Sequence, residues 1–284
     1  MERLKYLFDF YINSSIHVAL AVISFTLLTY FQLDLEPNFQ TLLFVGLATI
    51  SGYNFVKYFG LAKFHHRSLA TWLKWIQVFS LLCTLSLVYF VFQFDSKTLI
   101  FLGVLGLVTF LYAIPFIPKR YFLDHNQNLR QISGLKIYVI GFVWTAVTIG
   151  LPLVEHGLNM TWDIGVLSIQ RFLVVLVLML PFEIRDLKYD SIKLSTIPQS
   201  IGIRWTKALG CLLMLLVFLL EYLKDMLLQN ELLITLIIAV LTMVLLLVSN
   251  KEQSKYFSSF IVESIPIIWM LLALFSQFFI ESSL

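Results

Sequence analysis

Three carboxylates occupy a short stretch that follows one of the most apolar runs of this sequence. Glu183, Asp186 and Asp190 are three and four residues apart, a spacing that places side chains on one face of a helix. Like charges at these spacings repel; only Asp190 has a base at the same spacing, Lys193, and Arg185 is expected to point to another face. A magnesium ion, commonly held by one or two carboxylates and substrate phosphates, would relieve this repulsion. The stretch predicts a magnesium site, and the alternative is that these acids only solvate a loop at the membrane boundary.

The rest of the chain is too apolar for a soluble protein. Of its 284 residues, 59% are hydrophobic and 13% are charged, and the mean hydropathy is +0.87, whereas a soluble domain has about 25% charged residues. We therefore expect a polytopic membrane protein that is embedded in the lipid bilayer and does not bind nucleic acid. Cys83 and Cys211 lie inside apolar runs without CxxC spacing, which favours core packing over redox or zinc chemistry.

Nine apolar windows have roughly the 20 residues that a helix needs to cross the hydrocarbon core. We expect one integral membrane domain over residues 1–284, an all-α bundle of nine transmembrane helices. Pro115 and Pro118 end the fourth span, and Pro266 kinks the ninth. The predicted spans are 12–33, 39–59, 70–94, 98–117, 136–154, 163–182, 204–224, 230–249 and 257–280.

The basic residues predict the orientation of this bundle. With the N-terminus in the cytoplasm, every Lys and Arg except Lys97, Lys224 and Arg171 falls in a cytoplasmic segment, as the positive-inside rule requires. We expect an integral protein of a bacterial inner (cell) membrane, with the C-terminus outside and the active site open to the cytoplasm. Arg171 lies inside the sixth span, where we expect it to snorkel outward or to pair with an acid such as Asp163.

The acidic stretch and the residues after it resemble a known motif. "EIRDLKYD" followed by "STIPQSIG" is similar to the second aspartate-rich motif of the UbiA superfamily of membrane prenyltransferases, a D/ExxDxxxD helix followed by a Thr-Leu-Pro-like turn and a glycine. "LYAIPFIPKR" resembles the tyrosine-proline-basic stretch that ends the family's fourth helix. The nine-helix layout extends the resemblance over nearly the whole chain. The matching residues are Glu183, Asp186 and Asp190 for the acids, Thr196, Pro198 and Gly202 for the turn, and Lys119 and Arg120 for the basic pair.

This resemblance implies a Mg²⁺-dependent enzyme that moves a prenyl group from a polyprenyl diphosphate to an aromatic or other lipophilic acceptor, near the cytoplasmic face. In the family, two acidic motifs together hold the magnesium ions that bridge the protein to the diphosphate. The first of them, NDxxDxxxD, is degenerate here. The corresponding "GYNFVKYFGLAKFHH" keeps Asn54, has Phe55, Tyr58 and Ala62 at the aspartate positions, and adds Lys57.

Lys57 leaves two interpretations open. It could replace one metal ion by pairing directly with a diphosphate oxygen, as a compact cation can. Alternatively, Lys57 only snorkels at the interface, and the protein is a catalytically inactive UbiA-like protein that binds an isoprenoid or scaffolds partner enzymes.

The candidate site residues fall into three groups by the role that the resemblance implies. The first group would hold Mg²⁺, the second would neutralise the leaving diphosphate, and the third would contact substrate. These groups are Glu183, Asp186 and Asp190 for the metal, Lys57, Lys119 and Arg120 for catalysis, and Asn54, Arg130 and Lys188 for substrate binding.

Overall fold

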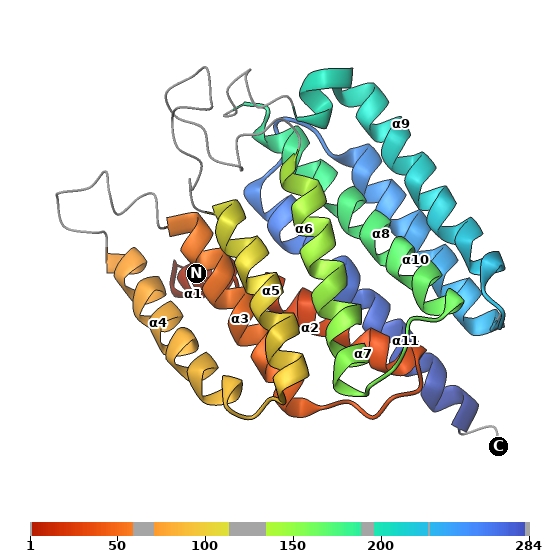
Figure 1. Cartoon of the computed structure of the whole chain (residues 1–284). Helices are drawn as coiled ribbons and strands as arrows, with labels where there is room; N and C mark the ends of the chain where they lie inside the picture. Colours follow the sequence, from red (N-terminus) through yellow and green to blue (C-terminus); the bar gives the residue numbers. More distant parts are fainter. Residues whose placement is uncertain (1, 59–70, 114–134, 189–195, 227, 282–284) are drawn as a thin grey trace, which may run out of the picture.

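The computed structural model of the protein describes residues 2–58, 71–113, 135–188, 196–226 and 228–281, and in these ranges it is helical with no strand. The helices run side by side in one bundle (Figure 1). They are α1 (Glu2–Asn13), α2 (Ile16–Gln32), α3 (Phe39–Tyr58), α4 (Thr71–Val91), α5 (Ser96–Ala113), α6 (Leu135–Thr145), α7 (Leu151–Glu155), α8 (Trp162–Asp186), α9 (Ile197–Leu220), α10 (Gln229–Val248) and α11 (Ile265–Glu281). Two π-helical segments, η4 (Ala146–Gly150) and η7 (Phe257–Ile261), and two 3-10 segments, η6 (Glu221–Leu223) and η8 (Val262–Ser264), join some of them.

The number of spans differs from the predicted nine. Seven helices or continuous helical runs are long and apolar enough to cross a membrane, and α1 with α2 would make an eighth, although this pair is bent by 56°. Within the described part of the chain, α5 is apolar over Ser96–Leu111, but this apolar stretch is shorter than the seven candidate spans. The expectation of an all-α membrane bundle is confirmed, and the count of nine is not.

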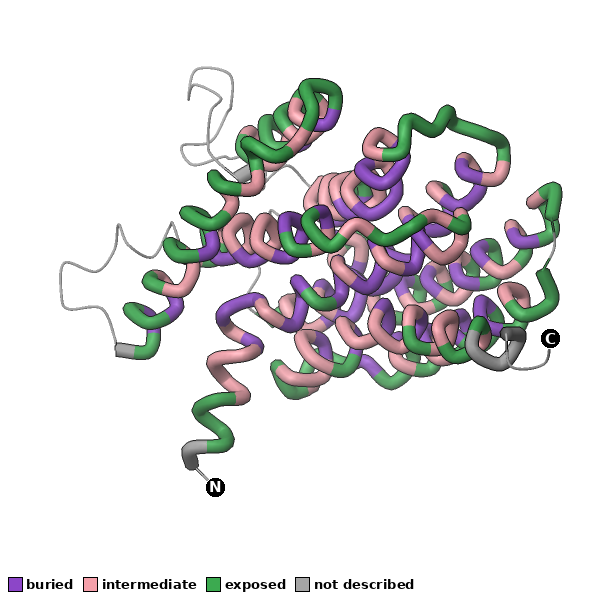
Figure 2. The backbone as a smooth tube through the Cα atoms, turned by 90° about the horizontal axis from the view of Figure 1, so that it is seen from below, coloured by how far each residue is buried: buried purple, intermediate pink, exposed green. Residues whose placement is uncertain are grey.

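The core of the bundle lies around α8. This helix packs against α6, α9 and α10, and 72% of its apolar window is buried inside the protein. In α4 the corresponding share is only 11%, and side chains such as Trp75, Leu81 and Leu85 are exposed. A helix that is apolar on all sides belongs in a core or a membrane, so α8 is the central helix and α4 faces lipid. Figure 2 shows the buried residues gathered in the middle of the bundle.

The first predicted span, 12–33, is broken rather than straight. α1 ends at Asn13, α2 begins at Ile16, and Ser15 between them has a left-handed backbone with φ of 63°. Such a conformation is unfavourable for a residue other than glycine. It therefore needs support from neighbouring helices, and that support comes from the end of α3.

Candidate active site

The helix ends that carry the predicted site meet at one end of the bundle. We call it the Asp186 face; it holds the end of α3 at Tyr58, the end of α8 at Asp186, the start of α9 at Ile197, and the connection 249–256. In Figure 1 this is the upper end, where α3, α5 and α8 finish and α4, α6 and α9 begin.

Glu183 is buried, with 2% of its surface exposed. Its Oε2 accepts a hydrogen bond from the backbone nitrogen of Ile197, the first residue of α9, at 3.3 Å. A carboxylate at a helix N-terminus is stabilised by the unpaired backbone N–H groups and the helix dipole. Glu183 therefore fixes the start of α9 against the end of α8.

The turn residues of the motif build the start of α9. Thr196 is the N-cap, and its backbone nitrogen donates to the side chain of Gln199 at 3.1 Å in a capping box. Pro198 lies in the first turn, where its missing N–H costs no helical bond. Gly202 has φ of 81° and ψ of 159° and kinks the helix. These residues turn the chain so that the nitrogen of Ile197 reaches Glu183.

Asp186 is paired with its neighbour in sequence. Arg185 donates from Nε and from Nη2 to Oδ1 of Asp186, both at 2.8 Å. The expectation that Arg185 points to another face is wrong, because Asp186 is the last residue of α8 and the long guanidinium turns toward it. Both side chains remain partly exposed, at 22% and 25%.

The helix that carries Glu183 and Asp186 ends before the position of Asp190. α8 ends at Asp186 with Leu187 as its C-cap, since the chain must turn there for Glu183 to cap α9. Asp190 itself lies outside the described residues, as do Lys119, Arg120 and Arg130. Within the residues that are described, no group of three His, Cys, Asp or Glu side chains could hold a metal ion, which leaves the three-ligand site a prediction.

The end of α3, where the first acidic motif would lie, supports the break between α1 and α2. Asn54 accepts a hydrogen bond from Ser15 Oγ at 2.8 Å and donates to the backbone oxygen of Ser14 at 2.9 Å and to Ser80 Oγ at 2.7 Å. Lys57 Nζ donates to Ser15 Oγ at 2.8 Å. Tyr58 donates to the backbone oxygen of Asn13 at 2.9 Å. Together these side chains hold the left-handed turn of Ser15 in place.

One carboxylate near the ends of α3 and α8 was missed by sequence reasoning. Glu263 in η8 lies within electrostatic range of both Lys57 and Arg185. Glu263 is thus near two cations of the Asp186 face, and within the described residues it forms an ion pair with neither. An acid inside a predicted membrane span is a functional-site hypothesis in its own right, so its position in 257–280 could have identified Glu263.

Ion pairs at the rim of this face join the connection 249–256 to its neighbours. Lys188, a predicted substrate contact, pairs with Glu252 at 2.5 Å. Lys255 pairs with Asp9 of α1 at 2.7 Å, and this hydrogen bond raises the pKa of Lys255. The two pairs tie the end of α8 and the first helix to one connection.

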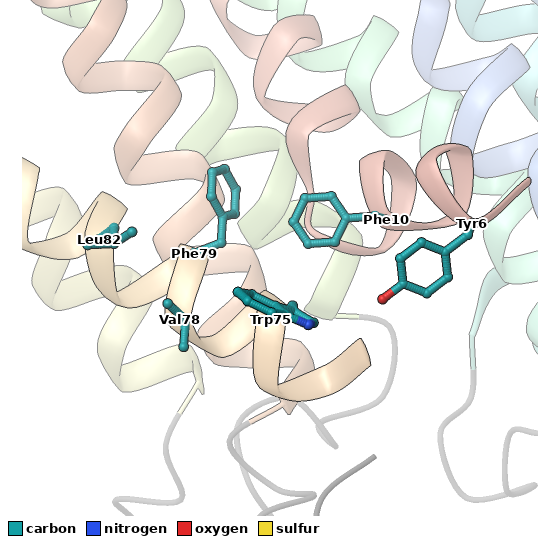
Figure 3. A pocket seen from close by; sticks show the side chains of 6 residues that line it. All are labelled: Tyr6, Phe10, Trp75, Val78, Phe79 and Leu82. Carbon is teal, nitrogen blue, oxygen red and sulfur yellow. The ribbon is translucent and has the colours of Figure 1, made fainter. Parts of the chain in front are cut away.

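An apolar groove of about 400 Å³ lies between α1 and α4. Its lining residues are shown in Figure 3, where Phe10 and Phe79 point toward each other; their ring centroids are 5.8 Å apart. None of the lining residues is charged; they are Tyr6, Phe10, Trp75, Val78, Phe79 and Leu82. The groove therefore has no group that could neutralise a diphosphate, and the charged residues of the Asp186 face are the better candidates.

Arg171 neither snorkels nor pairs with Asp163. It is 1% exposed, donates to the backbone oxygen of Phe25 at 2.7 Å and to Gln32 Oε1 at 3.1 Å, and lies over the Phe25 ring at 4.3 Å. Asp163 instead accepts a bond from the nitrogen of Asp225. Carbonyl dipoles and the ring face can hold a weakly hydrated guanidinium inside the bundle, so Arg171 joins α8 to α2.

Comparison with solved structures places these features in a known architecture. A structure of digeranylgeranylglyceryl phosphate synthase aligns with a TM-score of 0.54 and 16% identity, over 97% of this chain and 97% of the other. A UbiA homologue from Archaeoglobus fulgidus bound to DMAPP and Mg²⁺ aligns with a TM-score of 0.58 and 11% identity, over 94% of this chain and 98% of that one. A UbiA homologue from Archaeoglobus fulgidus bound to Cd²⁺ aligns with a TM-score of 0.58 and 12% identity, over 93% of this chain and 97% of that one. No family model and no curated protein matches the sequence. At these identities the likeness shows a shared fold.

Proposed function

We propose that this chain, whose fold is that of the UbiA superfamily, is a divergent intramembrane prenyltransferase. The observation that carries the proposal is the likeness of the whole bundle to solved UbiA-superfamily structures, one of them bound to DMAPP and Mg²⁺. The end of α8 supports it, because Glu183 and Asp186 lie there beside the turn that the second acidic motif predicts. The donor is a polyprenyl diphosphate, and the acceptor is an aromatic or other lipophilic molecule.

The carboxylates on α8 fit a magnesium ion shared with a diphosphate. Both bonds from Arg185 go to Oδ1 of Asp186, and within the described residues no bond to Oδ2 of this partly exposed side chain is seen, so Oδ2 could bind a cation. Glu183 lies one helical turn earlier, and we propose Asp190 as a third ligand. Such hard oxygen ligands suit Mg²⁺, which when bound neutralises charge on the leaving diphosphate.

The cations of the Asp186 face would bind and stabilise that diphosphate. Lys57 is held by the neutral hydroxyl of Ser15 and forms no ion pair within the described residues, so a diphosphate would not have to displace a bonded carboxylate. Arg185 adds a second cation that the sequence did not single out. Electrostatic stabilisation of the departing group supplies most of the rate in reactions of this kind. We assign the same role to Lys119 and Arg120, and substrate contacts to Arg130 and Lys188.

We further propose that the Asp186 face is cytoplasmic. The distribution of Lys and Arg supports this orientation, because all but three of them fall on the predicted cytoplasmic side. A water-soluble diphosphate head group would then reach the site from the cytoplasm while its prenyl chain stays in the bilayer.

A turnover assay tests the proposal. Purified full-length protein in lipid nanodiscs would be incubated with labelled geranyl, farnesyl and geranylgeranyl diphosphates, with and without Mg²⁺, and with a phenol or a long-chain alcohol as acceptor. We expect Mg²⁺-dependent release of pyrophosphate together with a prenylated product. Asp186→Asn should lower the release at least about tenfold, because the magnesium ligand is lost.

The matched control is Lys251→Gln, a change of an exposed residue in the connection 249–256, which should leave turnover unchanged. If no donor and acceptor pair releases pyrophosphate, the prenyltransferase assignment is wrong. Mg²⁺-dependent binding of inorganic pyrophosphate that Asp186→Asn abolishes, without any turnover, would instead support the inactive isoprenoid-binding alternative.

A further inference from the structure

Glu263 lies in the most irregular segment of the ninth predicted span. It belongs to η8, which follows the π-helix η7 and precedes α11. A π turn holds about one extra residue, which rotates the side chains after it by roughly 100° relative to an unbroken α-helix. π-helical turns inside α-helices often occur at functional sites, where they redirect a side chain.

Bonds from α2 and from η8 itself hold this irregular segment. The backbone oxygen of Phe260 accepts hydrogen bonds from Ser264 Oγ at 2.6 Å and from His17 Nε2 at 2.9 Å. Because a carbonyl can only accept, Nε2 carries the proton of His17, and Nδ1 accepts from the hydroxyl of Tyr11 at 2.6 Å. The backbone on both sides of Glu263 is thus held by bonds to α2 and within the segment itself.

Charged or titratable groups of four helices, α1, α2, α3 and α8, lie near Glu263. η8 packs against α2, α8 and α11. Lys57 of α3 and Arg185 of α8 lie within electrostatic range of the carboxylate, as does the hydroxyl of Tyr11 in α1. His17 of α2 contacts the adjacent Ser264 at 3.2 Å.

The oxygens of Glu263 differ from those of the other acids at this face. In the residues that the structure describes, no hydrogen bond and no ion pair reaches its carboxylate, and the side chain is partly exposed. Lys57 is bonded to Ser15 and Arg185 to Asp186. The other acids of the face are engaged: Glu183 with Ile197, Asp186 with Arg185, Glu252 with Lys188, and Asp9 with Lys255. Both oxygens of Glu263 are thus available to accept a proton.

We propose that Glu263 is the base that takes the proton lost by the acceptor during prenyl transfer, an inference that rests on the proposed function. In this step the C–O bond of the prenyl diphosphate breaks, and its electron pair leaves with the diphosphate. The acceptor's oxygen or aromatic carbon forms a bond to the prenyl carbon. The proton that the acceptor carried passes to the carboxylate of Glu263. Lys57 and Arg185 lie within electrostatic range of the base and belong to the proposed diphosphate site, which relates the two parts of the reaction.

The test compares Glu263→Gln with the wild type in the nanodisc assay. We expect the kcat of Glu263→Gln to fall at least about 100-fold, within the usual contribution of a general base, while the KM for the prenyl diphosphate stays within about threefold. The acidic limb of the wild-type pH–rate profile should disappear in this variant, because it reports the protonation of the base. Glu263→Asp should keep that limb at a lower rate. Glu36→Gln, a change of an exposed acid at the opposite end of the bundle, should match the wild type.

Binding of inorganic pyrophosphate with Mg²⁺, measured by calorimetry, shows whether the site survives. Wild-type turnover with an unchanged kcat and pH profile in Glu263→Gln would overturn the inference and leave the proposed function standing. Pyrophosphate binding without wild-type turnover would overturn both. If Glu263→Gln loses pyrophosphate binding or does not fold, the pH–rate profile of Glu263→Asp tests the inference instead. A shifted acidic limb in this variant would support the role as base, and an acidic limb at the wild-type position would show that the carboxylate is only structural.

Discussion

Asn54 has the residue type that the family's first motif requires, but its contacts are within the protein. Its side-chain oxygen accepts from Ser15, and its two N–H groups go to Ser14 and Ser80. Only 3% of its surface is exposed. The amide has no N–H group left to offer a substrate in this arrangement, so its contribution is to hold the break between α1 and α2.

Replacing Asn54 tests this role. Asn54→Ala should lower the free energy of unfolding by about 1–3 kcal/mol, because Ser14 and Ser15 lose partners in a buried place. The measurement is unfolding in detergent, followed by circular dichroism. Gln93→Ala, at an exposed position, should change stability by less than about 0.5 kcal/mol. An Asn54→Ala protein of wild-type stability with a raised KM for the prenyl diphosphate would return Asn54 to the substrate contacts.

At the scale of elements, the start of α9 combines a cap with a kink. Gly202 has φ of 81° and ψ of 159°, a region that is open essentially only to glycine. No atom lies within 4 Å of the place that a Cβ would take. The requirement for glycine is therefore one of backbone conformation, and it explains why the motif places a glycine after the Thr-Leu-Pro-like turn.

Gly202→Ala should destabilise the protein by about 1–3 kcal/mol through backbone strain alone. Gly165 in α8 is the matched control: it too has open space at the Cβ position, and its backbone is helical. Gly165→Ala should be neutral or stabilise the protein by up to about 1 kcal/mol, because alanine is the better helix former. The test is the melting temperature of each variant relative to the wild type, measured in the same detergent. Equal shifts for the two variants would contradict the assignment of strain to Gly202.

The contact between α1 and the connection 249–256 depends on pH. Asp9 raises the pKa of Lys255, so the pair contributes stability that is complete below the ordinary lysine pKa of about 10.5 and is lost as the pH rises through the raised value. The Lys255 side chain is 56% exposed, and the contribution should stay below about 1 kcal/mol. The stability difference between wild type and Lys255→Met should thus stay constant up to about pH 10 and shrink only above the ordinary lysine pKa of about 10.5. A difference that persists at high pH would show that packing, and not charge, joins α1 to the connection.

For the molecule as a whole, the sequence predicted the features that depend on neighbouring residues and missed those that depend on contacts between helices. Hydropathy summed over a window found the seven long apolar helical runs but predicted nine spans, and the residues from Thr196 to Gly202 identified the capped start of α9. The bend at Ser15 was missed because Asn54 and Lys57, which hold it, are some 40 residues away. The pairing of Arg185 with Asp186 depends on where α8 ends. Glu263 was missed because its neighbours Lys57 and Arg185 come from other helices.

The proposed function requires the Asp186 face to lie on the cytoplasmic side of the membrane, because a cytoplasmic diphosphate could not reach a site on the outer side. Single cysteines at Lys251 and at Glu36 lie at opposite ends, and both positions are exposed. Of the native thiols, Cys83 is buried, and both would be replaced by serine. A membrane-impermeant maleimide added to intact cells should label Glu36→Cys and leave Lys251→Cys unlabelled until the membrane is opened. The reverse pattern would place the Asp186 face outside the cell and exclude the cytoplasm as the source of its substrate.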